Sequence, residues 1–465
     1  MIWREYHEAT KHSAASLRRT PHVLDWANMP DPFRHYEGVP VFDLPADPPV
    51  PGASAPVADG ATFLSQLLYY SAAISATKLV PSTGFRYALR VNPSSGNLHP
   101  TEFHFVTRGL KDWPDGLYHY RPSSHMAEQR ATGEFKIAGS GGPIVFILTS
   151  IAWREAWKYR DRAYRYCLHD IGHAWQALTL AAEAMGCDSR KIVDFPDDEI
   201  ARALRLNEDE WPMLIVEIGG AACKSDARET VWYGGTANQL SKETIPYARI
   251  DAIHAATKLI VNSAVEPAPV GSGEIKLPPR AQSTCSFGEA ARKRRSALDF
   301  VGGTQSMSLP QLSALLTAAT PLLSFIQLYL YVHRVDELEP GVYRFWPAHA
   351  ELQLVKTGDQ RVAAAGLSLG QDLAGNACVA FSMIGDLERA ARAHGNRGYR
   401  YVHFEAGAIG HRLYLAAEAL GLEATGIGAF YDEEVHRYLH VTLEQGQVVY
   451  HFAIGYPVLD PRLQA

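Results

Sequence analysis

The sequence lacks the features that mark several large protein classes. Its five cysteines are scattered, without the closely spaced pairs of a zinc site or a small disulfide scaffold. The N-terminus carries charged residues from Arg4 onward, so we expect it not to be a secretory leader. The most apolar run, residues 321–332, is too short to span a bilayer. A formal charge of −6 with dispersed Lys and Arg gives no sign of nucleic-acid binding. We therefore expect a cytoplasmic protein with reduced thiols and with no metal, nucleic-acid or membrane partner.

What is present is an ordinary globular composition in a long chain. Of 465 residues, 47% are hydrophobic and 20% are charged, and this length accommodates more than one domain. Segments rich in Pro, Ala and Gly separate the parts, and residues 1–44 keep neither a helical nor a strand period for long. We predict an arm and linker (1–60), a first half (61–264), a linker (265–282) and a second half (283–465).

The two halves carry a repeated helical pattern. Residues 164–166 and 399–401 both read Tyr-Arg-Tyr, and we call their spacing, 399 − 164 = 235, the repeat offset. At the repeat offset eight positions of the first half recur between 407 and 421, and chance does not account for them: Gly172, Leu178, Leu180, Ala181, Ala182, Glu183, Ala184 and Gly186. The chain is therefore predicted to be a tandem duplication.

The copies differ by a deletion. A Gly-X-Tyr turn recurs at Gly116 and Gly341, an offset of 225, whereas a Leu-Leu pair recurs at Leu67 and Leu315, an offset of 248. The second half is therefore shorter between these landmarks by 248 − 225 = 23, in the region where the first half carries residues 93–100.

Residues 93–100 form a polar turn ahead of a buried strand. Pro93 fixes φ, Gly96 permits unusual backbone angles, and Ser94, Ser95 and Asn97 offer polar groups. Taken alone, such residues also make plain surface turns. With Arg90 before it and Glu102 after it, however, the segment resembles the flavin-binding loop of the nitroreductase superfamily. The resemblance is to its SagB-type branch, which includes azoline dehydrogenases of peptide-tailoring pathways.

The resemblance implies that the second half supplies the remaining flavin contacts. Arg294, Arg295 and Ser296 resemble the family's phosphate-binding Arg-X-Ser segment, although four consecutive basic residues also suit a solvated surface. The backbone of Gly426, Ile427 and Gly428 would approach the flavin ring, and the same glycines also suit a turn after a helix.

In homodimeric members of the family, one flavin site takes its Arg-X-Ser segment from one subunit and its Pro-Ser-Ser-Gly loop from the other. This chain has one copy of each segment, in different halves. The resemblance therefore implies an intramolecular pseudo-dimer with one intact FMN site per chain, and it leaves further oligomerisation open.

One position departs from the family pattern. Two residues after the serine the family has a basic residue near N1 and O2 of the flavin, and this chain has Leu298. Reduced flavin gains negative charge there, so another cation is required for turnover. Arg90 is the candidate.

Lys158 and Tyr159 resemble the Lys-Tyr pair of azoline dehydrogenases, in which the two residues serve as base and acid. A lysine acts as a base when burial or nearby cations favour the free amine, and Arg160 and Arg162 lie close in sequence. The alternative is a solvated lysine beside a packed tyrosine. The second half reads Ala393-His394 here, so the pair belongs to one copy.

These observations predict an α+β fold of nitroreductase type, duplicated in one chain, with antiparallel or mixed sheets wrapped by helices. The expected function is an FMN-dependent oxidoreductase that moves a hydride through flavin N5 to or from a small molecule or a modified peptide. NAD(P)H is a candidate electron donor. The alternatives are an azoline dehydrogenase in peptide tailoring and a flavin-binding scaffold without turnover.

Overall fold

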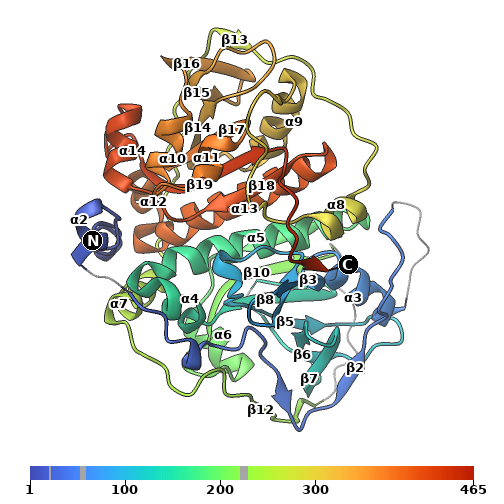
Figure 1. Cartoon of the computed structure of the whole chain (residues 1–465). Helices are drawn as coiled ribbons and strands as arrows, with labels where there is room; N and C mark the ends of the chain where they lie inside the picture. The colour runs from blue at the N-terminus through green and yellow to red at the C-terminus, as the bar shows by residue number, and fades with distance from the viewer. Residues whose placement is uncertain (20–21, 53–58, 138, 220–228, 465) are drawn as a thin grey trace. The chain divides into compact units, whose positions relative to one another are not determined.

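A computed structural model describes residues 1–19, 22–52, 59–137, 139–219 and 229–464, coloured along the chain in Figure 1. The chain divides into two compact units. We call Leu24–Ile250 with the last three residues the N-terminal unit, and Asp251–Arg462 with Met1–Val23 the C-terminal unit. The boundary falls within α7 (Ala248–Thr257).

The N-terminal unit is built on an antiparallel sheet in the order β11-β7-β6-β5-β8-β10-β9, with β2 also paired to β7. Its strands are β2 (Val41–Asp43), β5 (Thr101–Thr107), β6 (Gly116–Arg121), β7 (Met126–Thr132), β8 (Ile144–Ser150), β9 (Ser189–Ile192), β10 (Trp211–Ile218) and β11 (Val231–Trp232). Its helices are α3 (Gly60–Tyr69), α4 (Ala152–Tyr159), α5 (Ala163–Ala184) and α6 (Asp197–Leu204). Helix α5 packs against β5, β8 and β10, and β8 is buried throughout because its residues are almost all apolar.

The C-terminal unit repeats this order as β13-β16-β15-β14-β17-β19-β18. Its strands are β13 (Ile275–Lys276), β14 (Ile326–Val332), β15 (Gly341–Trp346), β16 (Glu351–Thr357), β17 (Val379–Gly385), β18 (Glu423–Ile427) and β19 (Gln447–Gly455). Its helices are α1 (Ile2–Ala9), α2 (Ala14–Arg19), α8 (Phe287–Lys293), α9 (Leu309–Ala319), α10 (Arg361–Leu367), α11 (Asp372–Asn376), α12 (Leu387–His394), α13 (Gly398–Ala419) and α14 (Asp432–Leu439). The predicted duplicated α+β fold is confirmed, and the named strands in both sheets pair antiparallel.

The two copies also share an individual side-chain hydrogen bond. In both units an arginine just before the long helix donates from Nε to a tyrosine hydroxyl one turn on, Arg162 to Tyr166 (3.1 Å) and Arg397 to Tyr401 (3.0 Å). The two pairs are related by the repeat offset, so the two copies have kept side-chain geometry as well as topology.

The structure also shows what the second copy lacks. Between α3 and β5 the N-terminal unit carries the hairpin β3 (Ile74–Val80) and β4 (Phe85–Arg90), then residues 93–100. Between α9 and β14 the C-terminal unit has only a short connection with a 3₁₀ turn. The deletion in the second copy therefore includes the hairpin as well as the loop.

Two segments are more ordered than their composition predicted. Residues 2–9, expected to be irregular, form α1, because Trp3 and Tyr6 pack their rings against Tyr399 (6.3 and 5.9 Å) and tertiary contacts stabilise a short helix. The predicted linker 265–282 contains β13, which pairs with β16 as β2 pairs with β7. Part of the first predicted linker, residues 53–58, lies outside the described residues.

No helix among the described residues is long and apolar enough to cross a membrane.

Candidate functional site

The loop at residues 93–100 is held from inside the N-terminal unit. Asp170 of α5 accepts hydrogen bonds from the backbone N–H and the hydroxyl of Ser95 (both 3.2 Å). The Asn97 amide donates to the Ala88 carbonyl (2.9 Å), and the His99 N–H donates to the Ser94 hydroxyl (2.8 Å). These bonds fix the loop and leave Gly96 exposed at its tip.

The backbone of this loop requires left-handed angles. Gly96 has φ +60°, and Asn97 and His99, at +60° and +48°, follow in the same region. Asparagine tolerates this conformation better than most residues do, and glycine adopts it without strain. The residue types that predicted a sharp turn therefore match the observed one.

The predicted catalytic pair lies directly against this loop. A Cβ atom built on Gly96 would lie 2.7 Å from the Tyr159 hydroxyl and 3.1 Å from the Lys158 amine. Both residues are in the last turn of α4, and the Tyr159 ring packs edge-on against Tyr166 at 4.5 Å. Gly96 therefore makes room for the two functional groups, and any larger residue there would displace them.

Two buried carboxyl groups near the pair were not predicted. Glu155 and Asp170 are 0% and 1% exposed. Burial raises the pKa of Asp170 to about 7, although the bonds from Ser95 lower it. Burial also raises the pKa of Glu155 well above its usual range, and the neighbouring Asp170 adds to the shift. A sequence signal existed, because Glu155 and Lys158 are three residues apart and share a helix face.

Arg90 contacts the N-terminal arm. Its guanidinium donates to the Pro32 carbonyl (2.6 Å) and stacks on Phe33 at 5.1 Å. Burial lowers the pKa of this guanidinium to about 10. Its role beside the flavin stays a prediction.

In the C-terminal unit, Tyr414 of α13 joins the predicted flavin residues. Its hydroxyl lies 2.8 Å from the Ser296 hydroxyl and accepts a hydrogen bond from the Gly426 N–H, also at 2.8 Å. The Arg294 guanidinium lies over the Tyr414 ring at 5.0 Å. Two predicted segments that are far apart in the sequence are thus brought together by a tyrosine that the sequence had not marked.

The remaining predicted residues of this unit differ in their burial and in their hydrogen bonds. Arg295 donates to the carbonyls of Arg292 and Arg294, at the end of α8. Ile427 is 3% exposed and belongs to the core of the unit, and Gly428 is half-buried. Leu298 is 44% exposed.

The groups present within each unit suit a part of a flavin mononucleotide. The phosphate needs cationic and hydroxyl donors, and residues 294–296 offer two guanidinium groups and one hydroxyl within a single short segment. The ring needs close backbone approach, and Gly96 offers an exposed backbone at the tip of a rigid loop.

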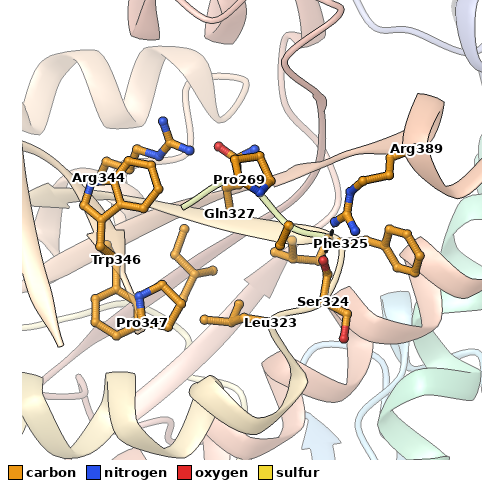
Figure 2. A pocket seen from close by; sticks show the side chains of 13 residues that line it. Pro269, Leu323, Ser324, Phe325, Gln327, Arg344, Trp346, Pro347 and Arg389 are labelled. Carbon is orange, nitrogen blue, oxygen red and sulfur yellow. Dashed lines mark hydrogen bonds between the residues drawn. The ribbon is translucent and has the colours of Figure 1, made fainter. Parts of the chain in front are cut away.

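A separate pocket lies in the C-terminal unit and involves none of the predicted site residues. Its lining comes from residues 268–269, 323–328 and 344–347 and from Arg389. Figure 2 shows Arg389 directed toward Ser324, to whose carbonyl it donates. Arg389 also donates to the Glu266 carbonyl (3.0 Å). Arg154, which corresponds to Arg389 at the repeat offset, donates in the same way to the Asp31 carbonyl (2.9 Å), so this pocket surrounds a structural contact common to both copies.

Comparison with known proteins identifies the family. The nitroreductase family model matches residues 72–220 and 291–456, which is more than half of the chain and one match in each copy. A solved nitroreductase-like protein from Anabaena variabilis ATCC 29413 is 25% identical, with a TM-score of 0.81 over 98% of this chain and 99% of that one.

Curated relatives match shorter stretches. A nitroreductase-like protein of Methanocaldococcus jannaschii is 32% identical over 116 residues, 25% of this chain and 59% of the relative. The microcin B17-processing protein McbC of Escherichia coli is 29% identical over 146 residues, 28% of this chain and 54% of McbC. The chain thus spans little more than half the length of these relatives, and the second of them supports the predicted resemblance to the SagB-type branch. This chain belongs to the nitroreductase family and contains the family domain twice.

Proposed function

We propose that the protein is an FMN-dependent oxidoreductase whose acid–base groups are Lys158 and Tyr159. The observation that carries the proposal is their position against Gly96, where a Cβ atom would lie within about 3 Å of both functional groups. In a chain of the nitroreductase family, a contact with the loop that resembles the flavin-binding loop supports a proton-transferring role for the pair.

Residues of both copies would hold the cofactor. Arg294, Arg295 and Ser296 would bind the phosphate, and residues 94–97 and 426–428 would contact the ribityl chain and the ring. Bound flavin supplies hydride transfer at N5, which no amino-acid side chain offers. Arg90 is the proposed cation for the charge that reduced flavin gains, because Leu298 offers none.

The two catalytic groups have complementary chemistry. Burial raises the pKa of Tyr159 well above 10, and Glu155 adds to the shift, so the phenol keeps its proton and can donate it. The Lys158 amine is half-buried beside it, 5.2 Å from the Tyr159 ring centre, and would accept a proton from the substrate.

The Lys-Tyr pair favours a modified peptide as substrate. Similarity to McbC, which processes microcin B17, supports an azoline-type dehydrogenation over the reduction of small molecules. Turnover with NAD(P)H and a quinone or nitroaromatic acceptor would instead favour a general reductase. Absence of turnover with FMN bound would favour a flavin-binding scaffold, the alternative that Leu298 supports.

The test begins with the cofactor. The purified chain is expected to be yellow and to release FMN, not FAD, on denaturation, because the predicted phosphate segment offers donors for one phosphate and the chain has no dinucleotide glycine fingerprint after a strand. A colourless protein that cannot be reconstituted with FMN would refute the proposal.

The second step tests the catalytic pair. Lys158→Ala is expected to lower turnover by roughly two to four orders of magnitude while FMN stays bound. Lys276→Ala, an exposed lysine of β13, is the control and should keep full turnover. Equal turnover in Lys158→Ala and the parent would return the pair to a structural role.

A further inference from the structure

Tyr414 is a buried tyrosine whose ring and hydroxyl have separate partners within the C-terminal unit. It is 3% exposed, its ring packs edge-on against Phe452 at 4.9 Å, and the Arg294 guanidinium lies over the ring at 5.0 Å. The hydroxyl accepts a hydrogen bond from the Gly426 N–H (2.8 Å) and lies 2.8 Å from the Ser296 hydroxyl. A phenylalanine would keep the ring contacts and lose only the hydroxyl, so an experiment can separate the two roles.

The backbone around Ser296 is held without this hydroxyl. Ser296 pairs with Ala424 of β18 in a parallel bridge, and the Ala297 N–H donates to the Ala424 carbonyl (3.0 Å). The Thr425 hydroxyl also donates to the Ala297 carbonyl (2.8 Å). These bonds fix the main chain of the segment against β18. The contribution of the Tyr414 hydroxyl is therefore to the direction of the Ser296 hydroxyl.

The first copy has a different pair of residues at these positions. At the repeat offset Tyr414 corresponds to Thr179, and Gly426 corresponds to Lys191. The buried Thr179 hydroxyl has no hydrogen-bond partner among the described residues, and Lys191 is exposed with its amine over the Trp175 ring at 4.4 Å. The tyrosine and the glycine thus occur in the copy that carries residues 294–296, and the other copy folds without them.

The hydrogen bond between the two hydroxyls has a preferred direction. Tyrosine and serine hydroxyls each have one proton to donate and lone pairs that accept. Because the Gly426 N–H donates to the Tyr414 oxygen, it polarises that oxygen and makes the Tyr414 hydroxyl the better donor of the two. The Ser296 oxygen then accepts the Tyr414 proton. The proton of Ser296 is left available to another acceptor.

We propose that Tyr414 is a positioning residue for the phosphate of FMN, which donates to Ser296 and so keeps the Ser296 proton free for a phosphate oxygen. The inference rests on the proposed function, which assigns residues 294–296 to the phosphate. An ionised phosphate presents acceptor oxygens, so a serine that gave its proton to Tyr414 would offer it only a lone pair. Arg294 and Arg295 supply charge, and the oriented hydroxyl adds a directed donor.

Titrations of the flavin-free full chain with FMN and with riboflavin test the proposal, because riboflavin is FMN without its phosphate. Tyr414→Phe is expected to raise the Kd of FMN by roughly 5- to 30-fold, the effect of weakening one hydrogen bond to a charged group. The Kd of riboflavin should stay the same, since the ring site is untouched. A purely structural role of Tyr414 would weaken both ligands equally.

Tyr331→Phe is the matched control. Tyr331 is likewise buried in the C-terminal unit, and its hydroxyl lies 3.1 Å from the hydroxyl of Ser382, away from the predicted flavin residues. The control removes a tyrosine–serine hydrogen bond of the same kind. It should leave the Kd of both flavins unchanged.

A double-mutant cycle with FMN alone tests the connection to Ser296. Ser296→Ala removes the hydroxyl that Tyr414 orients, so it should weaken FMN binding at least as much as Tyr414→Phe does. The double variant should then bind FMN no more weakly than Ser296→Ala, because the two residues act through one hydrogen bond. This cycle decides the question even if riboflavin binds too weakly to titrate.

Three results would overturn the proposal. They are an unchanged Kd of FMN in Tyr414→Phe, equal losses of FMN and riboflavin in that variant, and losses that multiply in the double variant. A parent that binds no FMN would defeat the proposed function together with this inference, whereas equal FMN binding by the parent and Tyr414→Phe would defeat this inference alone.

A second variant covers the case in which Tyr414→Phe does not fold. Tyr414→3-fluorotyrosine keeps the hydroxyl and makes it a stronger donor, because fluorine withdraws electrons from the phenol. FMN should then bind more tightly than in the parent, and riboflavin should bind equally well. Equal or weaker binding of FMN would contradict the proposed direction of the hydrogen bond.

Discussion

Arg160, which directly follows the catalytic pair, has a backbone conformation suited to glycine. Its φ and ψ are 53° and −138°. The second copy has Gly395 at the same place, with 59° and −145°. A non-glycine residue in such a region costs about 1–3 kcal/mol, and such strain is concentrated at functional sites. The first copy therefore has a strained residue beside Lys158 and Tyr159 at the position where the second copy has a glycine.

Arg160→Gly is expected to stabilise the protein by about 1 kcal/mol, because glycine adopts these angles freely. Urea unfolding measures the change. Gly395→Arg is the matched control and should destabilise by a similar amount. A loss of stability in Arg160→Gly would show that the contacts of the side chain outweigh the backbone cost.

Asp170 makes stability depend on pH. Burial raises its pKa from 3.8 to about 7, so the folded protein binds this proton more tightly than the unfolded chain does. The contribution to the free energy of unfolding is therefore full below about pH 4 and is lost as the pH rises through about 7.

In Asp170→Asn this dependence should disappear, and unfolding free energies measured across this range should fall less with rising pH than in the parent. Asp198→Asn, an exposed acid of α6, serves as the control. An unchanged slope in Asp170→Asn would show that Asp170 does not titrate in this range.

At the scale of elements, the pairing of β18 with β19 explains why position 426 of the predicted flavin segment is a glycine. Gly426 pairs with Phe452, and a Cβ atom on Gly426 would lie 2.0 Å from the Tyr450 hydroxyl. The glycine is thus required by packing within the sheet, whether or not a flavin approaches it.

Gly426→Ala is therefore expected to destabilise the protein by about 1–3 kcal/mol through overpacking. Tyr450→Phe removes the obstructing hydroxyl, so the double variant should recover part of the loss in a thermal or urea unfolding experiment. Equal losses in the single and double variants would show that the contact with Tyr450 is not the cause.

The sequence predicted the elements whose signals are local and strong. The long helices α5 and α13 follow from the repeated helical pattern, and the loop at 93–100 follows from Pro93 and Gly96. Helix α1 was not predicted from the sequence, because packing on Tyr399 stabilises it. The positions of Glu155 and Tyr414 near the predicted site residues were not predicted. They depend on contacts with residues distant in the sequence, and a single sequence does not contain that information.

At the scale of the whole molecule, the duplication predicts an unusual stoichiometry. A symmetric dimer of this total size would bind two flavins, since symmetry repeats every site. Here the C-terminal unit lacks the hairpin and the loop, and the N-terminal copy has no sequence that resembles residues 294–296.

We therefore expect one FMN per chain, measured by flavin titration. Arg294→Ala and a Ser94/Ser95 double alanine variant should each abolish binding, although the residues belong to different units. Lys276→Ala provides the control. Two flavins per chain, or full binding in either variant, would contradict the pseudo-dimer model.

The tandem arrangement also changes how this protein can evolve. In a homodimer, one codon specifies two positions, so a substitution that benefits one copy is imposed on the other. Here Ala390 and Ala393 could arise while Glu155 and Lys158 stayed in place, and Gly395 could arise while Arg160 stayed. A tandem chain is thus free of a constraint that a symmetric homodimer retains, and it allows a protein engineer to redesign one copy while the other keeps its sequence.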